Sequence, residues 1–567
     1  MLRQLFVGLL AIRLIAPAPA IAGDAVTAQP AAAHHGMVVA QEARAARIGL
    51  DVLRKGGNAV DAAVATAFAM AVTYPRAGNI GGGGYMVIHL AQGNIDTTID
   101  YRETAPAAVT RDTFLDDKGE ADPAKSRDSA LAIGVPGTVA GLTLADAKYG
   151  SGKFTLAELL APAIALARDG IPIEADVADS LPSVQGRLGR WPASAKIFLK
   201  PDGQTLAAGD TLLQRDLADT LATIARDGPR GFYEGAIADK IANAVQAAGG
   251  VMTRDDLANY RPIERAPVRG SYRGYDIVSM PPSSSGGVVL LEILNILEGY
   301  RDLAADDARR AHLTVEAMKF AYADRATFLG DPASTEVPVE RLISKDYAAE
   351  IRRGIDPEHA RPAAEIRPTL PAPHEGRNTT HFSVVDGFGN AVSNTYTLNF
   401  SYGVGLVAEG TGILLNNELD DFAAKPGAPN AFGLTGGEAN APGPGKRPLS
   451  SMTPTIVLKD GKPYVVTGSP GGSRIITAVL QVISNVIDRK LSITDAVAAP
   501  RLHNQWMPDE VLMERAFPPE LVRALEQRGH HVVPAPPGTS ANSIMVTPEG
   551  FVGAADPRTR GSFAAGY

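Results

Sequence analysis

Two β-prone runs of the chain, 379–386 and 390–399, carry hydroxyl groups at alternate positions and flank the residues Gly387-Phe388-Gly389. Two alternating runs around a short glycine-containing turn predict a β-hairpin. If residues 387–389 form the loop, Thr379 faces Thr397 across the two strands. Facing side chains on one face of a sheet lie ~5 Å apart, so this register brings two threonine hydroxyls together. A loop longer by one residue would reverse the faces, and the inference therefore depends on the turn.

The same register divides the hairpin into a polar and an apolar face. One face holds mostly small, polar side chains: Thr379, His381, Ser383, Ala391, Ser393, Thr395, Thr397 and Asn399. The other face holds Phe382, Val384, Tyr396 and Leu398. Alternation alone favours a solvated sheet surface for the polar face. The segment that precedes Thr379 changes this interpretation.

That segment, from Arg361 to Arg377, is rich in proline and polar residues, which indicates an exposed linker. A threonine that heads a strand directly after a cleavable linker can become an N-terminal nucleophile. Its freed α-amine then serves as the general base, a role suited to an α-amino pKa of ~7.7. We therefore predict that the chain cleaves its own Asn378–Thr379 bond and that Thr379 is its nucleophile.

At these residues the sequence resembles the γ-glutamyltranspeptidases, a family of N-terminal nucleophile hydrolases, and the resemblance covers nearly the whole mature chain. The matching motifs follow one another in order: Gly57-Asn-Ala-Val-Asp-Ala-Ala63, Gly81 to Gly84, Tyr101-Arg-Glu-Thr-Ala-Pro106, Pro281-Pro-Ser-Ser-Ser-Gly-Gly287, Asn378-Thr-Thr-His-Phe-Ser-Val-Val-Asp386, Leu414-Leu-Asn-Asn-Glu-Leu-Asp-Asp-Phe422, Lys446-Arg-Pro-Leu-Ser-Ser-Met452 and Gly468-Ser-Pro-Gly-Gly-Ser-Arg474. A glycine run alone is a weak signal. Together, in order and at these spacings, the motifs are very specific.

The resemblance implies an α+β fold, a four-layer αββα sandwich of the N-terminal nucleophile hydrolase type, with two sheets flanked by helices. It also implies one precursor that cuts itself into a large subunit, residues 23–378, and a small catalytic subunit, residues 379–567. The two subunits stay associated as a heterodimer. The family cleaves the γ-glutamyl amide of glutathione and similar compounds, and passes the glutamyl group to water or to an amino acid or peptide.

The resemblance also assigns catalytic roles. Thr379 matches the residue that attacks the γ-carbonyl and forms a γ-glutamyl ester. Thr397 matches the threonine that hydrogen-bonds and orients the nucleophile, in agreement with the hairpin register. Gly471 and Gly472 match the oxyanion-hole pair, whose backbone N–H groups are typically worth ~3–4 kcal/mol each. Glycine permits the close approach that such a site needs.

Further residues match the family's binding site for the glutamyl group: Arg102, Asn399, Glu418, Asp421, Ser450 and Ser451. Arg102 and the two serines match groups at the α-carboxylate, for which a planar guanidinium is well suited. Asn399, Glu418 and Asp421 match the ligands of the α-ammonium. Taken singly, Arg102 also fits a structural ion pair, and residues 418–421 also fit a solvated acidic turn. The joint match favours the binding roles.

The stretch from Pro426 to Gly445 matches the lid loop that covers the pocket in many family members. Many bacterial relatives carry a tyrosine in this loop, and the aligned residue here is Phe432. A phenylalanine covers the pocket but cannot make the hydrogen bond of a tyrosine. We therefore expect a lid without its hydroxyl latch.

The N-terminus has the pattern of a signal peptide over residues 1–22. Arg3 is a short positive region, an apolar stretch runs from Leu5 to Ile15, and Ala20-Ile21-Ala22 fits a cleavage site. The stretch is too short to span a bilayer, and no later segment has eighteen uninterrupted apolar residues. We expect a periplasmic or secreted protein without a stable membrane span.

Composition excludes several other chemistries. The 567 residues include no cysteine, which excludes disulfides and thiolate nucleophiles. The net charge is −8, without the basic cluster that would indicate a nucleic-acid partner. The adjacent pairs His34-His35 and His530-His531 do not form a two-histidine metal face, because neighbours on a strand point to opposite sides. We expect no cofactor and no metal. The expected partners are a small γ-glutamyl donor such as glutathione and an amino-acid or peptide acceptor.

Two rival functions stay open. A cephalosporin or glutaryl-amide acylase would share the fold and the self-cleavage, but its acyl group lacks the α-amine that Glu418 and Asp421 would bind. A non-catalytic periplasmic binding protein for amino acids would explain export and a carboxylate-binding Arg102. It would not explain the junction between the linker and Thr379.

Overall fold

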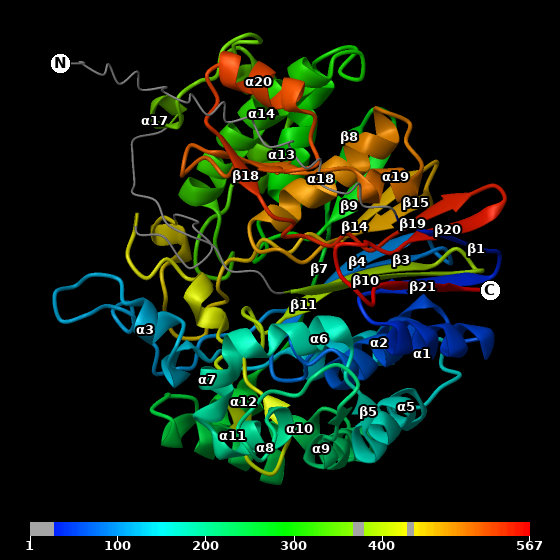
Figure 1. Ribbon diagram of the computed structural model, residues 1–567, viewed down its shortest axis with the longest axis vertical. Coiled ribbons are helices and arrows are strands. Elements are labelled where there is room, and N and C mark those ends of the chain that lie inside the picture. Colours follow the sequence, from blue (N-terminus) through cyan, green and yellow to red (C-terminus); the bar gives the residue numbers. More distant parts are fainter. Residues whose placement is uncertain (1–27, 367–378, 428–435) are drawn as a thin grey trace, which may run out of the picture.

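The computed structural model describes residues 28–366, 379–427 and 436–567. Two stacked sheets lie between two layers of helices, which is the predicted αββα sandwich (Figure 1). The predicted signal peptide over residues 1–22, the cleavage-site residue Asn378 and the lid residue Phe432 lie outside the described ranges. Among the residues that are described, no helix is long and apolar enough to cross a membrane.

The first sheet has seven antiparallel strands in the order β21-β2-β10-β11-β3-β4-β7. These strands are β21 (Phe563–Gly566), β2 (Gly36–Ala40), β10 (Thr380–Asp386), β11 (Ala391–Thr397), β3 (Gly83–Leu90), β4 (Ile95–Tyr101) and β7 (Ile263–Arg265). The sheet therefore combines strands from before and after the predicted cleavage site, with β10 paired to β2 on one side and to β11 on the other.

The second sheet also has seven antiparallel strands, in the order β1-β20-β19-β15-β14-β9-β8. They are β1 (Pro30–Ala33), β20 (Gly550–Ala554), β19 (Ser543–Thr547), β15 (Lys462–Thr467), β14 (Thr455–Lys459), β9 (Tyr275–Ser279) and β8 (Val268–Tyr272). This sheet too mixes strands from both sides of residue 378. Three short sheets are formed by β5 (Ile171–Pro172) with β6 (Thr211–Leu212), by β12 (Val407–Ala408) with β13 (Ile413–Leu414), and by β16 (Leu502–His503), β17 (Val511–Glu514) and β18 (Val532–Ala535).

One helix layer covers the outer face of each large sheet (Figure 1). The layer on the first sheet and the helices beyond it are α1 (Ala43–Arg54), α2 (Ala59–Thr73), α4 (Thr138–Tyr149), α5 (Leu156–Asp169), α6 (Ala175–Ser180), α7 (Gln185–Gly189), α8 (Pro192–Phe198), α9 (Arg215–Asp227), α10 (Arg230–Tyr233), α11 (Gly235–Ala247) and α12 (Arg254–Asn259). The layer on the second sheet and its neighbours are α13 (Gly286–Glu298), α14 (Asp307–Phe328), α15 (Val339–Leu342), α16 (Lys345–Arg352), α18 (Arg474–Ile487), α19 (Ile493–Ala498) and α20 (Pro519–Gln527). The helix α3 (Pro123–Ser126) is a single turn.

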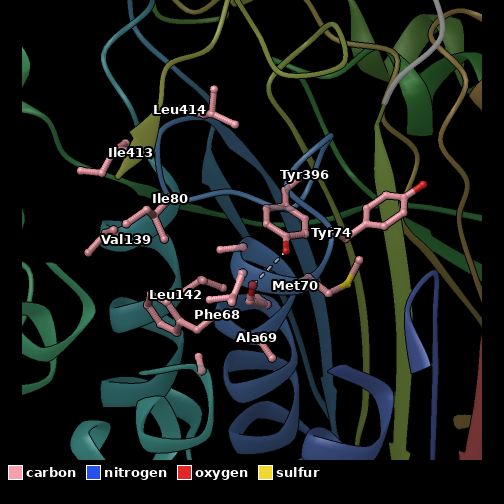
Figure 2. Packing of buried hydrophobic residues seen from close by; sticks show 14 of the residues in the cluster. Phe68, Ala69, Met70, Tyr74, Ile80, Val139, Leu142, Tyr396, Ile413 and Leu414 are labelled. Carbon is pink, nitrogen blue, oxygen red and sulfur yellow. Dashed lines mark hydrogen bonds between the residues drawn. The ribbon is translucent and has the colours of Figure 1, made fainter. Parts of the chain in front are cut away.

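Helix α2 supports the strand hairpin from below. The helices α1, α4 and α5 and the first sheet surround it and bury every one of its residues. A helix that is buried on all sides needs apolar residues all round, which explains its sequence. Asn58 begins the helix as predicted, accepting hydrogen bonds from the amides of Val60 and Asp61. Figure 2 shows Tyr396 of β11 pointing into this helix, where its hydroxyl donates to the Ala67 carbonyl at 2.9 Å.

The hairpin β10–β11 has the predicted register. The pairs run from Thr380 opposite Tyr396 to Val385 opposite Ala391. The loop is the predicted 387–389, closed by a 3.1 Å hydrogen bond from the Asp386 amide to the Asn390 carbonyl. Gly389 has φ +88°, a conformation that glycine adopts without strain.

The polar face of this hairpin is buried between the two sheets, so a solvated-surface interpretation is wrong. His381 Nδ1 lies 2.9 Å from Thr395 Oγ1, and its Nε2 lies 3.0 Å from Ser383 Oγ. The Ser393 hydroxyl donates across the gap to the carbonyl of Thr467 in β15, at 2.9 Å. These bonds satisfy polar groups that would otherwise be costly to bury. Farther along the strands the gap becomes apolar, with Met37, Val39, Val87, Val278, Val385, Ile456, Leu458, Val466 and Ile544.

The predicted linker is not wholly extended. Its first residues form the helical turn α17 (Ala363–Ile366), and Ala363 is buried. The Ala363 amide donates to Asp509 at 2.8 Å, and its carbonyl accepts from the Trp506 indole at 2.9 Å. The prediction of an exposed linker is therefore wrong for Ala363, which contacts with distant residues hold in place, whereas Ala364 and Glu365 in the same turn are exposed as predicted. Residues 367–378 lie outside the described ranges.

Candidate active site

Thr379 stands immediately before β10, and Thr397 is the last residue of β11. Both line one cavity at this end of the first sheet. The Thr397 hydroxyl oxygen accepts a 2.9 Å hydrogen bond from the Asn399 amide, and the Asn399 side chain donates to the Asn417 carbonyl at 2.9 Å. Asn399 has φ +73°, which an asparagine tolerates better than most residues. The chain thus turns sharply after β11 and brings Asn399 back to the cavity.

The cavity gathers nearly all the predicted site residues. The predicted residues that line it are Arg102, Thr379, Thr397, Asn399, Glu418, Asp421, Ser450, Ser451 and Gly472. Gly471 is not among the lining residues. Four lining residues were not predicted: Arg325, Met452, Ser473 and Ile475.

Gly471 and Gly472 form the turn between β15 and α18. Their φ angles are +136° and +59°, so both lie in the region that favours glycine. A Cβ on Gly471 would lie 2.7 Å from the Gly538 carbonyl oxygen, and a larger residue would push this segment away. The turn leads directly into α18, whose N-terminal end carries a partial positive charge. This end of the cavity is therefore suited to stabilising a negatively charged oxygen.

Arg102 follows β4 and is completely buried. Its Nη1 donates to Glu418, its Nη2 donates to Asp421 at 2.5 Å, and its Nε donates to the Pro448 carbonyl at 3.1 Å. Burial by itself would lower the pKa of Arg102, but the neighbouring Glu418 and the other nearby acidic groups outweigh it and raise that pKa. Arg102 is therefore a permanent cation at the edge of the cavity.

Glu418 and Asp421 begin and end the short 3₁₀ helix η3 (Glu418–Asp421). Burial raises the pKa of both carboxyl groups, and Arg102 opposes that shift. Asp420, between them, points elsewhere and accepts a 2.5 Å hydrogen bond from Ser126. Because Glu418 and Asp420 are buried and Asp421 is nearly so, the solvated acidic turn is wrong.

Ser450 and Ser451 belong to the loop that pairs with residues 283–285. The Ser450 hydroxyl oxygen accepts from the Met452 amide at 3.1 Å. The Ser451 hydroxyl oxygen accepts a 3.2 Å hydrogen bond from the Nη2 of Arg325, which lies in the last turn of α14. No sequence pattern singles out Arg325, because a basic residue in the last turn of a helix is ordinary. Only the packing of α14 against this loop brings it to the cavity.

The described residues of the predicted lid, 426–427 and 436–445, make contacts with one another and with the cavity. The Gly427 amide donates to the Gly436 carbonyl at 3.0 Å. The Asn440 side chain, in the short 3₁₀ helix η4 (Glu438–Asn440), donates to the Asp421 carbonyl at 2.7 Å. Phe432 itself lies outside the described residues, so the missing latch stays a prediction.

One group of side chains elsewhere has the composition of a metal site. His312, Glu316 and His530 bring their nitrogen and oxygen atoms within 4.8 Å of one another. The two histidines are hydrogen-bonded to each other, Nδ1 to Nε2, at 2.7 Å, and Glu316 is ion-paired with Lys319 at 3.2 Å. These contacts describe a buried hydrogen-bond network, and a metal ion would have to replace them.

This chain has the four-layer sandwich of the N-terminal nucleophile hydrolases, with Thr379 at the head of a central strand and at the edge of a polar cavity. The chain belongs to the gamma-glutamyltranspeptidase family, whose model matches residues 45–566. It is 51% identical over 541 residues to a protein of Escherichia coli K12 named glutathione hydrolase proenzyme, covering 95% of this chain and 93% of that one.

Acylases are also among the relatives. The chain is 39% identical to the Acylase ACY 1 proenzyme of a Pseudomonas species, strain SE83, over 96% of both proteins. Among solved structures, the cephalosporin acylase from Bacillus halodurans matches with a TM-score of 0.83 and 29% identity, over 99% of each chain. The fold is therefore common to both activities, and the side chains in the cavity must distinguish them.

Proposed function

We propose that this chain is a self-processing γ-glutamyltransferase and glutathione hydrolase with Thr379 as its nucleophile. The observation that carries the proposal is the single cavity in which Thr379 and Thr397 lie beside the ion-paired group of Arg102, Glu418 and Asp421. The name of the 51% identical relative, glutathione hydrolase proenzyme, supports both the activity and the processing.

Maturation begins with Thr379 acting on its own peptide bond. Its Oγ1 attacks the carbonyl carbon of Asn378, the bond to the Thr379 nitrogen breaks, and the hydroxyl proton passes to that nitrogen. Water then hydrolyses the resulting ester. The products are a large subunit, residues 23–378, and a small subunit, residues 379–567, whose first residue carries a free α-amine.

The same hydroxyl then performs turnover. The α-amine of Thr379 accepts the hydroxyl proton as Oγ1 attacks the γ-carbonyl carbon of the donor. The carbonyl oxygen becomes an oxyanion near Gly471 and Gly472, whose backbone N–H groups stabilise it. The leaving amine takes the proton, and a γ-glutamyl ester of Thr379 is left. Water or the amine of an amino acid or peptide attacks this ester and restores the hydroxyl.

The charges of the cavity support a zwitterionic acyl group. Arg102 and Arg325 supply guanidinium groups, and Glu418 and Asp421 supply carboxyl groups, so the lining offers partners for charges of both signs. Asn399, Glu418 and Asp421 are assigned to the α-ammonium, and Arg102, Ser450 and Ser451 to the α-carboxylate. A γ-glutamyl group brings one charge of each sign, and each charge finds a partner of opposite sign.

The acylase alternative is weaker for the same reason. A glutaryl group brings a carboxylate without an ammonium, so it would add a third anion beside Glu418 and Asp421. Burial already raises the pKa of both carboxyl groups, which shows that further negative charge is unwelcome there. The glutamyl assignment therefore fits the lining residues better.

We place the mature protein in the periplasm or outside the cell, as a heterodimer of its two subunits. The proposed location is supported by the signal-peptide pattern over residues 1–22. The donor is a small γ-glutamyl compound such as glutathione, and the acceptor is an amino acid or peptide.

Intact mass spectrometry combined with a γ-glutamyl anilide assay tests the proposal. Wild type should give two chains divided at Asn378–Thr379, whereas Thr379→Ala should stay a single, inactive chain. Thr380→Ala is the matched control, because Thr380 is buried on the opposite face and its hydroxyl has no hydrogen-bond partner among the described residues. It should mature normally. Maturation of Thr379→Ala in a protease-free preparation would exclude Thr379 as the cleaving group. A mature wild type that prefers glutaryl over γ-glutamyl anilide would be an acylase.

A further inference from the structure

Arg325 is a buried cation that forms no direct ion pair with a carboxylate among the described residues, although the charge of Asp421 acts on it from a greater distance. Its side chain is almost completely buried and lines the same cavity as Thr379. Its Nε donates to the Ser285 hydroxyl at 2.9 Å, and its Nη2 donates to the Ser451 hydroxyl at 3.2 Å. Within residues 28–366, 379–427 and 436–567, no carboxylate forms an ion pair with it. A buried charge is costly unless an anion offsets it.

Arg102, the other guanidinium in the cavity, is in the opposite situation. Two carboxylates, Glu418 and Asp421, receive its N–H groups directly. The two arginines are close enough to influence each other. Burial, with a smaller contribution from Arg102, lowers the pKa of Arg325 to about 10, and Tyr322 and Asp421 oppose the shift. Arg325 therefore stays protonated at neutral pH, but an added anion would stabilise it far more than it would stabilise Arg102.

The hydrogen bonds of Arg325 also prepare a second donor. Because the Ser451 oxygen accepts from Nη2, the Ser451 hydroxyl proton is free to point toward another acceptor. Ser451 lines the cavity too. A guanidinium N–H next to a hydroxyl O–H is a donor set that suits one carboxylate, and charge-assisted hydrogen bonds of this kind are the strong ones.

Ser285 fixes the guanidinium from the other side. Its hydroxyl accepts from Arg325 and donates to the Ser450 carbonyl at 2.7 Å. The Ser285 amide donates to the same carbonyl at 2.8 Å. Arg325 is therefore held against the Ser450–Ser451 loop by a chain of hydrogen bonds, and little side-chain freedom is left to lose when an anion binds.

We propose that Arg325, together with the Ser451 hydroxyl that it orients, binds the α-carboxylate of the donor and selects acyl groups that carry one. The inference rests on the proposed γ-glutamyl activity and adds a second cation to the assigned Arg102. In this arrangement Arg102 and Arg325 both serve the α-carboxylate, and Arg325 contributes the guanidinium that is not already ion-paired with Glu418 and Asp421.

Three anilide donors distinguish recognition of the α-carboxylate from recognition of the α-amine. γ-Glutamyl-p-nitroanilide has both the amine and the carboxylate, glutaryl-p-nitroanilide has only the carboxylate, and 4-aminobutyryl-p-nitroanilide has only the amine. Arg325→Gln should lower kcat/KM on the order of ten- to a hundredfold for the two donors with a carboxylate, as expected for a lost charged hydrogen bond. The 4-aminobutyryl donor should change less than about threefold, measured as turnover or as competitive inhibition of γ-glutamyl hydrolysis.

The controls keep the result interpretable. Arg310→Gln, on the same helix but ion-paired with Asp307, should leave all three donors unchanged. If Arg325→Gln stays uncut, Arg325→Lys and Ser451→Ala replace it in the comparison. Their kcat/KM should fall by a smaller factor, again more for the two donors with a carboxylate than for the 4-aminobutyryl donor. Equal losses on all three donors, or no loss on γ-glutamyl anilide, would overturn the inference. A wild type without γ-glutamyl activity would instead overturn the proposed function, before any variant is made.

Discussion

The guanidinium of Arg102 is shared between two acids, and this sharing requires its planar, forked shape. Nη1 reaches Glu418 and Nη2 reaches Asp421, while Nε is held by the Pro448 carbonyl. A lysine ammonium is a single point charge and cannot reach both acids in fixed directions. The positions of the Glu418 and Asp421 carboxyl groups therefore depend on Arg102.

Arg102→Lys should therefore mature normally but bind donors poorly. We expect KM for γ-glutamyl anilide to rise on the order of tenfold or more, with the two-chain pattern intact on gels. Arg273→Lys is a suitable control, because Arg273 is ion-paired with Asp488 on the opposite side of the sandwich. An unchanged KM in Arg102→Lys would remove Arg102 from donor binding.

Asp421 gives a second prediction, which concerns the ammonium. Asp421→Asn removes a carboxylate that would pair with the α-ammonium of a glutamyl group but would repel a glutaryl group. We expect kcat/KM to fall at least about tenfold more for γ-glutamyl than for glutaryl anilide. The neighbouring Asp420→Asn, whose carboxylate accepts from Ser126, should affect both donors alike. Equal losses on both donors in Asp421→Asn would favour an acylase.

The site residues differ in how far the sequence could reveal them. Thr379 and Thr397 follow from local alternation and one turn, because hairpin partners are close in sequence. Arg102, Glu418 and Asp421 come from segments far apart, and only the resemblance to a family joined them. Neither local alternation nor the resemblance to a family points to Arg325. Its place in the cavity depends on the packing of the end of α14 against the Ser450–Ser451 loop, which the sequence does not reveal.

At the scale of elements, the β10–β11 hairpin is held by its neighbours as well as by its turn. β2 pairs with β10 and β3 pairs with β11, so both strands are central. The side chains of both strands are buried on both faces. A slip by one residue would exchange the apolar face against α2 with the polar face between the sheets.

Insertion of one glycine after Phe388 should therefore be tolerated. Phe388 is 72% exposed at the tip of the loop, so the extra residue can extend into solvent. Lengthening a loop by one residue costs well below ~1 kcal/mol. We expect complete self-cleavage and a thermal midpoint within a few degrees of wild type. An insertion variant that stays uncut would mean that the turn, and not the sheet, sets the register.

For this hairpin the register could be predicted from the sequence, but the burial of its polar face could not. Its register was predictable because the turn and the alternation are local. Its environment was not, since the alternation of His381, Ser383 and Thr395 is equally typical of a wet surface. The second sheet covers this face, and its partners Thr467 and Asn542 come from residues far along the chain. Burial of a polar face needs such distant hydrogen bonds, which no window of sequence contains.

At the scale of the whole molecule, two buried histidines make the stability of the folded protein depend on pH. Burial lowers the pKa of His381 to about 3. Burial, with Lys319 and other nearby cations, also lowers the pKa of His530 to about 3. In the unfolded chain a histidine titrates near ~6.5. Between these values the unfolded state binds more protons, so the stability contributed by both groups is complete above ~6.5 and is lost as pH falls toward 3.

We therefore expect the urea midpoint of the purified protein to decrease steadily from pH 7 to pH 4. His530→Gln should show a shallower decrease over that range, whatever its stability at pH 7, because one of the histidines with a lowered pKa is gone. His359→Gln is the control, since His359 is well exposed and its removal should leave the slope unchanged. A His530→Gln variant with the slope of wild type would contradict the assignment.

Both large sheets interleave strands from before and after residue 378, and β10 is hydrogen-bonded between β2 and β11. A cut at Asn378–Thr379 in the folded molecule therefore yields two chains that share the same ladders, rather than two bodies that touch at a surface. To part them, both sheets would have to dissolve. We therefore expect the two chains of such a pair to stay together on dilution and not to exchange between molecules, so that each enzyme would keep the two pieces from which it was synthesised.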